Sequence, residues 1–246
     1  MMAVREEEVG CSLSWETPSN RPLDGYSGPK IDLLAVVPSQ MIHILDLHDA
    51  GGLPPVGDII IGGAPISPGL SRRIAASGLR AWETYGMTET ASHIALRRVT
   101  FPASPFTALD GVEVSVTPDS RLNIRIKDWQ ELTTNDIAHI SSPGRFEILG
   151  RADNVIITGG KKVHPETVEA VVESTLDAEV LVTSEPDEKW GQRVVLVIDD
   201  SRGAPVPRDT LEIISVLKKV LPPESVPKAI VFGPIPRTPN GKKKRK

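Results

Sequence analysis

The 246-residue sequence contains one cysteine, Cys11, so the chain cannot form an internal disulfide. No apolar run approaches the ~20 residues that a helix needs to cross a bilayer, and no secretory signal pattern opens the chain. Basic residues are not in excess: 28 Lys and Arg stand against 32 Asp and Glu. This balance argues against a general nucleic-acid or anionic-membrane partner. These absences predict a cytoplasmic protein without membrane insertion.

The sequence has the composition of a soluble globular protein of one or two domains, with 39% hydrophobic and 24% charged residues. It contains no internal repeat and no low-complexity segment. Its pattern of elements changes near residues 150–153, which predicts one region over residues 1–151 and a second over residues 152–246.

The first region reads as several strands with one helix between two of them. Residues 32–37 and 58–62 form apolar runs typical of buried strands. Ser67 and Pro68 predict a helix start and Gly78 its end, and a further strand leads into Tyr85. A strand, helix, strand order predicts a crossover unit, and such sheets bind ligands beyond the carboxyl ends of their strands.

The order of strands and helices in the second region predicts a compact α+β domain of about 90 residues. We expect a strand over residues 154–157, a turn at Gly159-Gly160 and a helix opened by Pro165. Further strands are expected at 180–182, 194–198 and 229–232. The apolar faces expected for its two helices consist of Val168, Val171, Val172 and Leu176, and of Leu211, Ile214, Leu217 and Leu221.

Two short segments at strand ends suggest chemistry. Thr88-Glu89 puts a hydroxyl, which can bond a phosphate oxygen, beside a carboxylate, which can hold Mg²⁺. The plain alternative is a helix-capping threonine and a solvated glutamate. Gly62-Gly63-Ala64 would let a flat ring approach the backbone closely, or would simply make a tight strand-to-helix turn.

Three segments in order along the chain resemble the adenylate-forming acyl-CoA synthetase family. They are Tyr85-Gly86-Met87-Thr88-Glu89-Thr90, then Gly150-Arg151-Ala152-Asp153 running into Gly159-Gly160-Lys161, then Pro236-Arg237-Thr238-Pro239-Asn240-Gly241-Lys242. The resemblance implies an α/β fold in which a partial large adenylate-binding domain, built of β-α-β sheet layers, precedes a small mobile α+β carboxy-terminal domain. It also implies an enzyme that uses ATP, Mg²⁺ and coenzyme A.

The resemblance assigns roles in nucleotide binding to the first segments. It implies that Thr88 contacts the AMP phosphate, that Glu89 binds Mg²⁺ and that Tyr85 lies against the adenine, a face suited to stacking. The other residues that it places around the nucleotide are Gly62, Gly63, Ala64, Gly86, Asp136 and Arg151.

The ribose contacts and the hinge come from the same resemblance. Asp136 corresponds to the carboxylate that accepts hydrogen bonds from both ribose hydroxyls, although Asn135 stands where the family has glycine. Asparagine tolerates positive φ, so we expect the turn there to survive. Arg151 is expected to contact the ribose, and Asp153 to be the hinge about which the small domain swings.

Lys242 is the expected catalytic lysine of the first half-reaction. A carboxylate attacking the α-phosphate of ATP builds negative charge, which a positioned ammonium offsets. Residues 242–246 are also a basic run that could be a solvated tail or a polyanion-binding signal. For the second half-reaction, the resemblance implies that Gly159, Gly160 and Lys161 flank the pantetheine arm of coenzyme A; a simple hairpin turn is the alternative.

The resemblance is closest to the o-succinylbenzoate-CoA ligases of menaquinone biosynthesis. It rests on residues 88–98, 106–109 and 159–165 and covers most of the chain. The substrate would then be an aromatic carboxylic acid, and Ser92 and His93 are candidates for its pocket. The remaining histidines show no metal-ligand spacing.

One family feature is missing from the sequence, the Ser/Thr/Gly-rich loop with a lysine that holds the ATP phosphates. The segment Ser27-Gly28-Pro29-Lys30 lacks the Ser/Thr-Gly repeat. Three hypotheses remain open: a fragment of an active ligase, one half of a split ligase whose other half is a second chain, and a non-catalytic adenylate-binding remnant. A homodimer is a further possibility. The fragment hypothesis is favoured, because the amino terminus resembles the middle of a fold.

Overall fold

The computed structural model describes residues 2–129, 131–200, 206–237 and 243–245. The chain divides into two compact units, one of Met1–Ile66 with Leu70–Asp110 and the other of Ser67–Gly69 with Gly111–Lys246. Among the described residues, no helix has the length and apolar character needed to cross a membrane.

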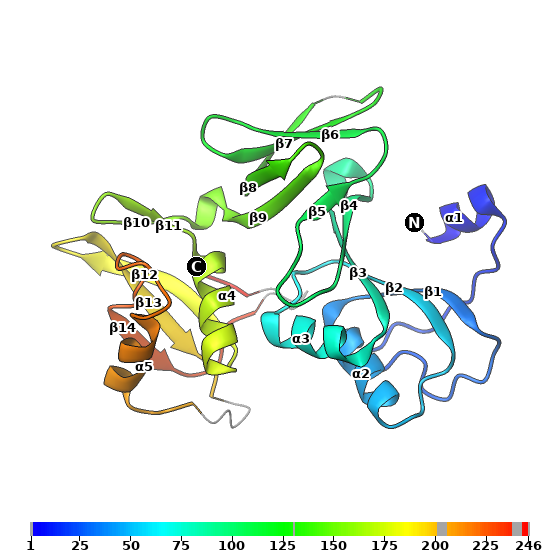
Figure 1. Cartoon of the computed structure of the whole chain (residues 1–246), viewed down its shortest axis with the longest axis horizontal. Coiled ribbons are helices and arrows are strands. Elements are labelled where there is room, and N and C mark those ends of the chain that lie inside the picture. The colour runs from blue at the N-terminus through cyan, green and yellow to red at the C-terminus, as the bar shows by residue number, and fades with distance from the viewer. Residues whose placement is uncertain (1, 130, 201–205, 238–242, 246) are drawn as a thin grey trace. The chain divides into compact units, whose positions relative to one another are not determined.

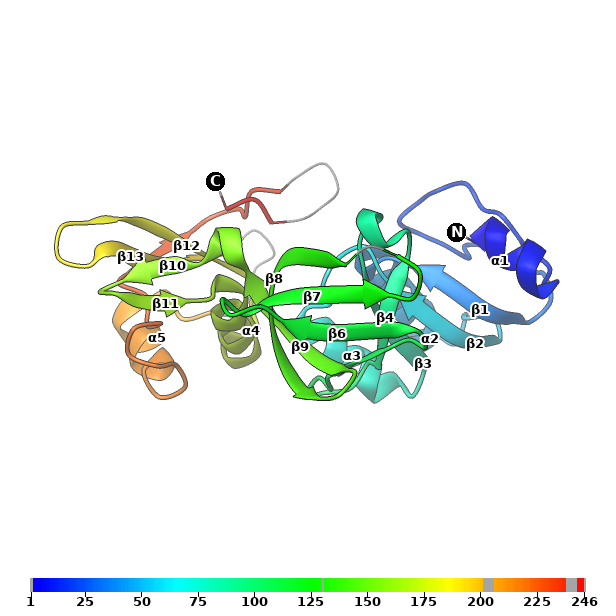
Figure 2. The same cartoon turned by 90° about the horizontal axis from the view of Figure 1, so that it is seen from above.

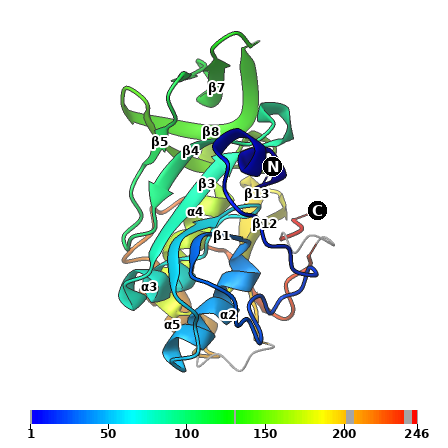
Figure 3. The same ribbon diagram turned by 90° about the vertical axis from the view of Figure 1, so that its right-hand side faces the viewer.

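The first unit contains the predicted strand-helix-strand crossover and a second crossover that precedes it in the chain. Strands β1 (Ile31–Val36), β2 (Val56–Ile61) and β3 (Arg80–Gly86) are parallel and adjacent in that order. Helices α2 (Pro38–Asp49) and α3 (Pro68–Ser77) connect them and lie on one face of the three strands (Figure 1, Figure 3). The sheet continues with β4 (His93–Arg98), antiparallel to β3, and β5 (Phe106–Ala108), antiparallel to β4. Helix α1 is Met2–Val9.

Local sequence explains where these elements begin and end. Pro38 ends β1 as expected, but it also occupies the first turn of α2, a helix that the sequence reading did not anticipate. Helix α3 begins at Pro68 and ends just before Gly78, whose φ of +77° is the left-handed conformation that stops helices. The apolar faces of these helices and the strand residues facing them form the core of this unit: Val36, Met41, Ile44, Leu45, Ile59, Ile61, Ile74 and Ala81.

The second unit begins with an antiparallel meander. Its strands β6 (Val112–Val116), β7 (Arg121–Ile126), β8 (Leu132–Ser142) and β9 (Arg145–Arg151) pair in sequence order. The last strand, β9, leads into a 3₁₀ turn, η2 (Ala152–Asn154).

A smaller five-stranded sheet follows in the same unit. The strands are β10 (Ile156–Thr158), β11 (Lys161–Val163), β12 (Val180–Asp187), β13 (Gly191–Ile198) and β14 (Ala229–Phe232), ordered β11-β10-β13-β12 with β14 parallel to β13. Helices α4 (Pro165–Leu176) and α5 (Thr210–Leu217) cover one face of it (Figure 2). The buried core includes Val168, Val172, Val180, Val182, Val194, Leu196, Ile198, Ile213 and Leu217.

Two local expectations in this unit were wrong. Residues 154–157 are not one strand, because the chain first makes the η2 turn and becomes extended only at Ile156. On α5, Leu211 is 75% exposed, whereas Ile213 is 1% exposed. The Asp209 side chain accepts a hydrogen bond from the Leu211 amide at 2.8 Å, which places Leu211 in the first helical turn, facing solvent.

Candidate functional site

The Thr88-Glu89-Thr90 segment forms a 3₁₀ turn, η1 (Thr88–Thr90), directly after the carboxyl end of β3. The turn is braced from within: the Met87 amide donates to Thr90 Oγ1 at 3.0 Å, and that hydroxyl donates to the Ser92 carbonyl at 2.7 Å. Thr88 and Glu89 are both exposed on it. Within the described residues, no hydrogen bond or ion pair engages the Thr88 hydroxyl or the Glu89 carboxylate. The turn therefore presents a free hydroxyl and a free carboxylate at the edge where parallel sheets bind ligands.

The backbone at the base of this turn requires glycine. A Cβ atom on Gly86 would overlap with the Ser92 carbonyl oxygen and the His93 backbone, because β3 and β4 come together there with a shift in register. Gly86 was predicted as a nucleotide-binding residue. The structure gives it a second reason to be glycine, since it lets the chain reverse closely enough to project Thr88 and Glu89.

The Gly62-Gly63-Ala64 segment follows β2, the parallel neighbour of β3, so both segments leave the same edge of the sheet. A Cβ on Gly62 would lie 2.6 Å from Thr84 Oγ1, and Gly63 has a φ of +86°, so both positions need glycine. The half-buried Tyr85 ring lies 5.7 Å from the ring of Phe106, centroid to centroid. This edge of the first unit thus combines close-packed backbone with an aromatic side chain.

The two acyl-pocket candidates adjoin the η1 turn. Ser92 Oγ lies 3.4 Å from His93 Nδ1, and both residues are half-buried. Sequence reasoning missed the pair behind them, Glu83 and Arg97, which link β3 to β4 through Arg97 Nε and Glu83 Oε2 at 2.7 Å. The sequence signal that could have indicated this pair is Glu83, an acidic residue at a position of β3 where an apolar side chain is expected.

In the second unit, Asp136 and Arg151 face each other across β8 and β9. Arg151 Nη1 lies 3.3 Å from Asp136 Oδ1, and the Arg151 guanidinium also binds Asp153 at 3.1 and 3.2 Å. The pKa of Arg151 is raised, first by the hydrogen bond to Asp153 and also by the charge of Asp136. Two predicted ribose contacts and the predicted hinge residue are therefore brought together.

The turn expected around Asn135 is not present. Thr134 to Asp136 lie within strand β8, and Asn135 is not among the residues with positive φ. The Asp136 amide instead donates to Thr134 Oγ1 at 3.0 Å, so the Thr134 side chain binds the backbone of Asp136. Extended backbone needs no glycine, which explains how asparagine fits here.

The Gly159-Gly160 turn lies between β10 and β11, as predicted, with φ values of +56° and +77°. The Gly159 amide donates to the Trp190 carbonyl at 2.9 Å, and a Cβ on Gly159 would lie 2.8 Å from the Trp190 ring. Lys161 forms an exposed ion pair with Glu224 at 3.3 Å. Sequence reasoning missed Trp190, although its exposed ring beside a double glycine is a surface feature worth noting.

Lys242, the predicted catalytic lysine, lies outside the described residues. Among the residues that are described, no group of three or more His, Cys, Asp or Glu side chains could hold a metal ion. Mg²⁺ is commonly held in nucleotide sites by one or two carboxylates together with substrate phosphates. The single exposed carboxylate of Glu89 fits that kind of site, with phosphate oxygens as the other ligands.

The comparisons with known proteins agree on one family. Residues 166–242 match the AMP-binding enzyme C-terminal domain. The chain is 29% identical to a 2-succinylbenzoate–CoA ligase of Listeria monocytogenes over 88% of its own length and 50% of that protein. It spans about half the length of the curated relatives it matches.

Solved structures are similar over both units. An acyl-CoA synthetase (AMP-forming)/AMP-acid ligase II-like protein from Dyadobacter fermentans matches 93% of this chain and 67% of its own, at 29% identity and a TM-score of 0.54. The o-succinylbenzoate CoA synthetase of Bacillus subtilis, solved with an acyl-adenylate intermediate, matches 86% of this chain and 49% of its own, at 22% identity and a TM-score of 0.71. The latter similarity concerns the fold, and it confirms the predicted α/β class.

Proposed function

The chain belongs to the family of adenylate-forming acyl-CoA ligases, whose carboxy-terminal part it matches, and on this premise we propose its function. The proposed reaction joins an aromatic carboxylic acid, o-succinylbenzoate, to coenzyme A at the expense of ATP. The substrate proposal is supported by the residues around the η1 turn and by relatives named 2-succinylbenzoate–CoA ligase.

One observation supports the proposed function more strongly than the others. The Tyr85–Thr90 string ends a parallel strand, and its Thr88 hydroxyl and Glu89 carboxylate are exposed at the carboxyl edge of the sheet. Gly86 lets the chain reverse closely between β3 and β4, and this reversal projects the two side chains. Hydroxyl and carboxylate together suit a magnesium nucleotide, because one bonds phosphate oxygen and the other attracts the cation.

In the first half-reaction, a carboxylate oxygen of the acid attacks the α-phosphorus of ATP, the bond to the β-phosphate breaks, and pyrophosphate leaves. Thr88 bonds an oxygen of the α-phosphate, and the Lys242 ammonium offsets charge that grows as the bond forms. Bound Mg²⁺ would neutralise phosphate charge beside Glu89. Asp136 accepts hydrogen bonds from the ribose hydroxyls and holds the nucleotide in register for attack.

In the second half-reaction, the thiolate of coenzyme A attacks the acyl carbon, and AMP leaves with the electrons of the broken acyl-phosphate bond. Asp153 is the proposed hinge between the two poses. The turn at Gly159-Gly160 offers backbone without side chains to the pantetheine arm, and Lys161 lies beside it. Ser92 and His93 are proposed to contact the acyl group.

Two hypotheses from the sequence stay open beside this proposal, an adenylate-binding remnant and one half of a split ligase. An adenylate-binding remnant, or one half of a split ligase, would keep the η1 turn and the Asp136–Arg151 pair without turnover by itself. These alternatives differ from the main proposal in what the isolated chain does.

The test uses this chain alone, and this chain joined to the amino-terminal half of the Listeria relative. Each is incubated with Mg-ATP, o-succinylbenzoate and coenzyme A, and the thioester and AMP are measured by mass spectrometry. Thioester from the joined protein but not from the chain alone is the result we expect. Glu89→Gln should remove it, whereas Glu188→Gln, an exposed carboxylate on the β12–β13 connection, should not.

The same samples decide between the alternatives. If AMP binds the folded chain, it should raise the melting temperature of the isolated chain, and the rise should increase with AMP concentration. AMP binding without thioester from either protein supports the remnant. Absence of both AMP binding and thioester overturns the proposal.

A further inference from the structure

Helix α4 carries three acidic side chains on one face, Glu166, Glu169 and Glu173, because residues three, four and seven apart share a helix face. Glu169 and Glu173 are only 6% and 8% exposed. Carboxylates at that depth require partners, since an unpaired buried charge is strongly destabilising. Some of these partners lie in the backbone: the Val182 amide donates to Glu169 Oε1 at 2.8 Å.

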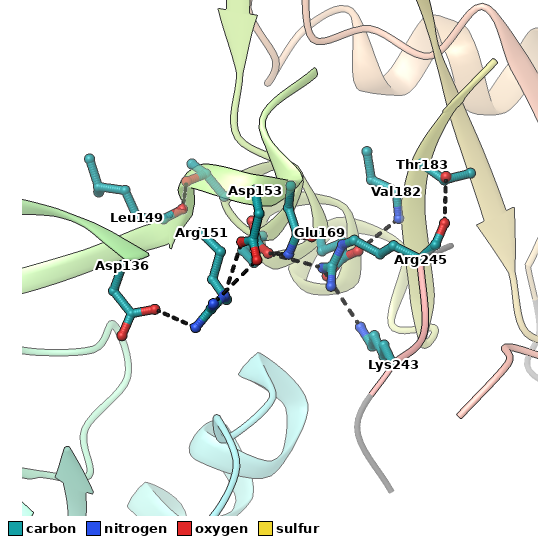
Figure 4. Close-up of polar contacts among 12 residues, drawn as sticks. Asp136, Leu149, Arg151, Asp153, Glu169, Val182, Thr183, Lys243 and Arg245 are labelled. Carbon is teal, nitrogen blue, oxygen red and sulfur yellow. Dashed lines mark hydrogen bonds and ion pairs between the residues drawn. The ribbon is translucent and has the colours of Figure 1, made fainter. Parts of the chain in front are cut away.

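The remaining partners come from the last residues of the chain. Lys243 Nζ lies 2.7 Å from Glu173 Oε1 and donates to the Val180 carbonyl at 2.6 Å. Arg245 Nη2 lies 2.6 Å from Glu169 Oε2 (Figure 4). The side chains of Lys243 and Arg245 are only 20% and 14% exposed. They are therefore docked against α4 and not solvated, which argues against a free basic tail.

Backbone contacts hold the same segment. The Lys244 amide donates to the Pro236 carbonyl at 2.8 Å, and Arg237 and Lys243 form an antiparallel bridge. Thr183 Oγ1 donates to the Arg245 carbonyl at 3.3 Å, and Arg237 pairs with Glu179. The chain is thus fixed at Arg237 and again at Lys243, on both sides of residues 238–242.

The acidic face also reaches the residues after β9. Glu166 Oε1 accepts a hydrogen bond from Asn154 Nδ2 at 2.6 Å and lies 3.6 Å from Arg245 Nη2. Thr167 Oγ1 donates to the Leu149 carbonyl at 2.7 Å. Helix α4 therefore contacts both the end of the chain and the residues next to the proposed hinge.

We propose that Lys243 and Arg245 are positioning residues, which lock the end of the chain onto the acidic face of α4 and so hold the adjoining Lys242 for its reaction. This inference rests on the proposed function for the role of Lys242. Its structural part, the lock, stands on the contacts above. Lys243 follows Lys242 directly in the sequence, and consecutive Cα atoms are only about 3.8 Å apart, so an anchor at Lys243 acts next to the proposed catalytic residue.

The first experiment measures the lock itself. Amide hydrogen exchange of Lys244 is followed in the unaltered chain and in Arg245→Met, Arg245→Lys and Lys243→Met. We expect a protected Lys244 amide that exchanges about tenfold faster or more when either cation is lost, and partial recovery in Arg245→Lys. Arg208→Met is the matched control, because Arg208 forms an exposed ion pair with Asp200 in the same unit. An unprotected Lys244 amide in the unaltered chain would overturn the proposal.

The second experiment measures the consequence in the protein joined to the amino-terminal half of the Listeria relative. Arg245→Met and Lys243→Met should lower kcat for adenylate formation by about 10- to 100-fold, with the KM for ATP little changed. Thioester formation from preformed acyl-adenylate should fall by far less. If the variants show faster Lys244 exchange but unchanged adenylate formation, the proposed positioning of Lys242 is wrong and the proposed function still stands. If the unaltered joined protein forms no acyl-adenylate, the proposed function is wrong, whereas the hydrogen-exchange result for the lock still stands.

Discussion

Glu83 and Arg97 face each other across the antiparallel pair β3–β4, on the two strands that the η1 turn connects. Glu83 is 5% exposed, and its second oxygen accepts a hydrogen bond from the Ile66 amide at 3.2 Å. Arg97 lies over the Phe106 ring, 4.3 Å from its centroid, and donates to the Ser104 carbonyl at 3.2 Å. A single charge pair thus ties together the elements that support Thr88 and Glu89.

Removing one partner of this pair should destabilise the first unit. Glu83→Gln leaves the Arg97 guanidinium short of a countercharge, and we expect a loss of about 2–3 kcal/mol in urea unfolding. Glu113→Gln is the control, since its ion pair with Arg125 is exposed and should contribute less than ~1 kcal/mol. A double-mutant cycle with Arg97→Met measures the coupling, and a value near zero would contradict the assigned role.

Gly86→Ala should disturb the η1 turn while leaving the fold in place. The added Cβ overlaps with backbone, which cannot move aside like a side chain, so β3 and β4 must separate locally. We expect AMP affinity to fall by about tenfold or more, measured by calorimetry. Gly69→Ala in α3 is the control, because nothing lies within 4 Å of its Cβ position. If Gly86→Ala and Gly69→Ala bind AMP equally well, Gly86 does not contribute to nucleotide binding.

Asp136 should confer discrimination between ribose and deoxyribose. If its carboxylate accepts hydrogen bonds from the ribose hydroxyls, the chain should bind AMP about tenfold more tightly than 2′-deoxy-AMP. Asp136→Ala should bring the two affinities together, and Glu188→Ala should leave the ratio unchanged. Retained discrimination in Asp136→Ala would assign the ribose contact to another residue.

Glu169 should make stability fall as pH rises above its ordinary pKa. Burial raises the pKa of this carboxyl from 4.5, while the charges of Lys243 and Arg245 lower it and that of Glu166 raises it; Glu173 lies on the same helix face. The folded state therefore holds the proton more tightly than the unfolded state. The contribution of protonated Glu169 is fully present below pH 4.5 and is lost as pH rises through the folded pKa.

The measurement compares urea unfolding of the unaltered chain and of Glu169→Gln from about pH 4 to about pH 7, a range that begins just below the ordinary pKa of the carboxyl and rises above it. Their difference isolates Glu169 from other titrating groups. We expect the difference to grow in favour of Glu169→Gln with rising pH, and to grow more steeply when Lys243→Met is added to both. A difference independent of pH would show that Glu169 keeps the same ionisation in both states.

Local pattern by itself determined much of this protein. Apolar runs predicted β1, β2 and β14, Pro165 predicted the start of α4, and the double glycine predicted the turn before β11. These features depend on residues close in sequence, whose side-chain period and backbone preferences can be read directly. The motif strings likewise located Thr88 and Glu89 at a strand end.

Tertiary structure alone decided features that depend on distant residues. The inward-facing Glu83 pairs with Arg97, the extended strand at Asn135 replaces an expected turn, and Leu211 faces solvent where a helical pattern predicted burial. The same holds for the end of the chain, where a basic run that reads as a solvated tail meets buried carboxylates on α4. Charge in a sequence shows that a side chain needs water or a partner, but only the fold determines which of the two it finds.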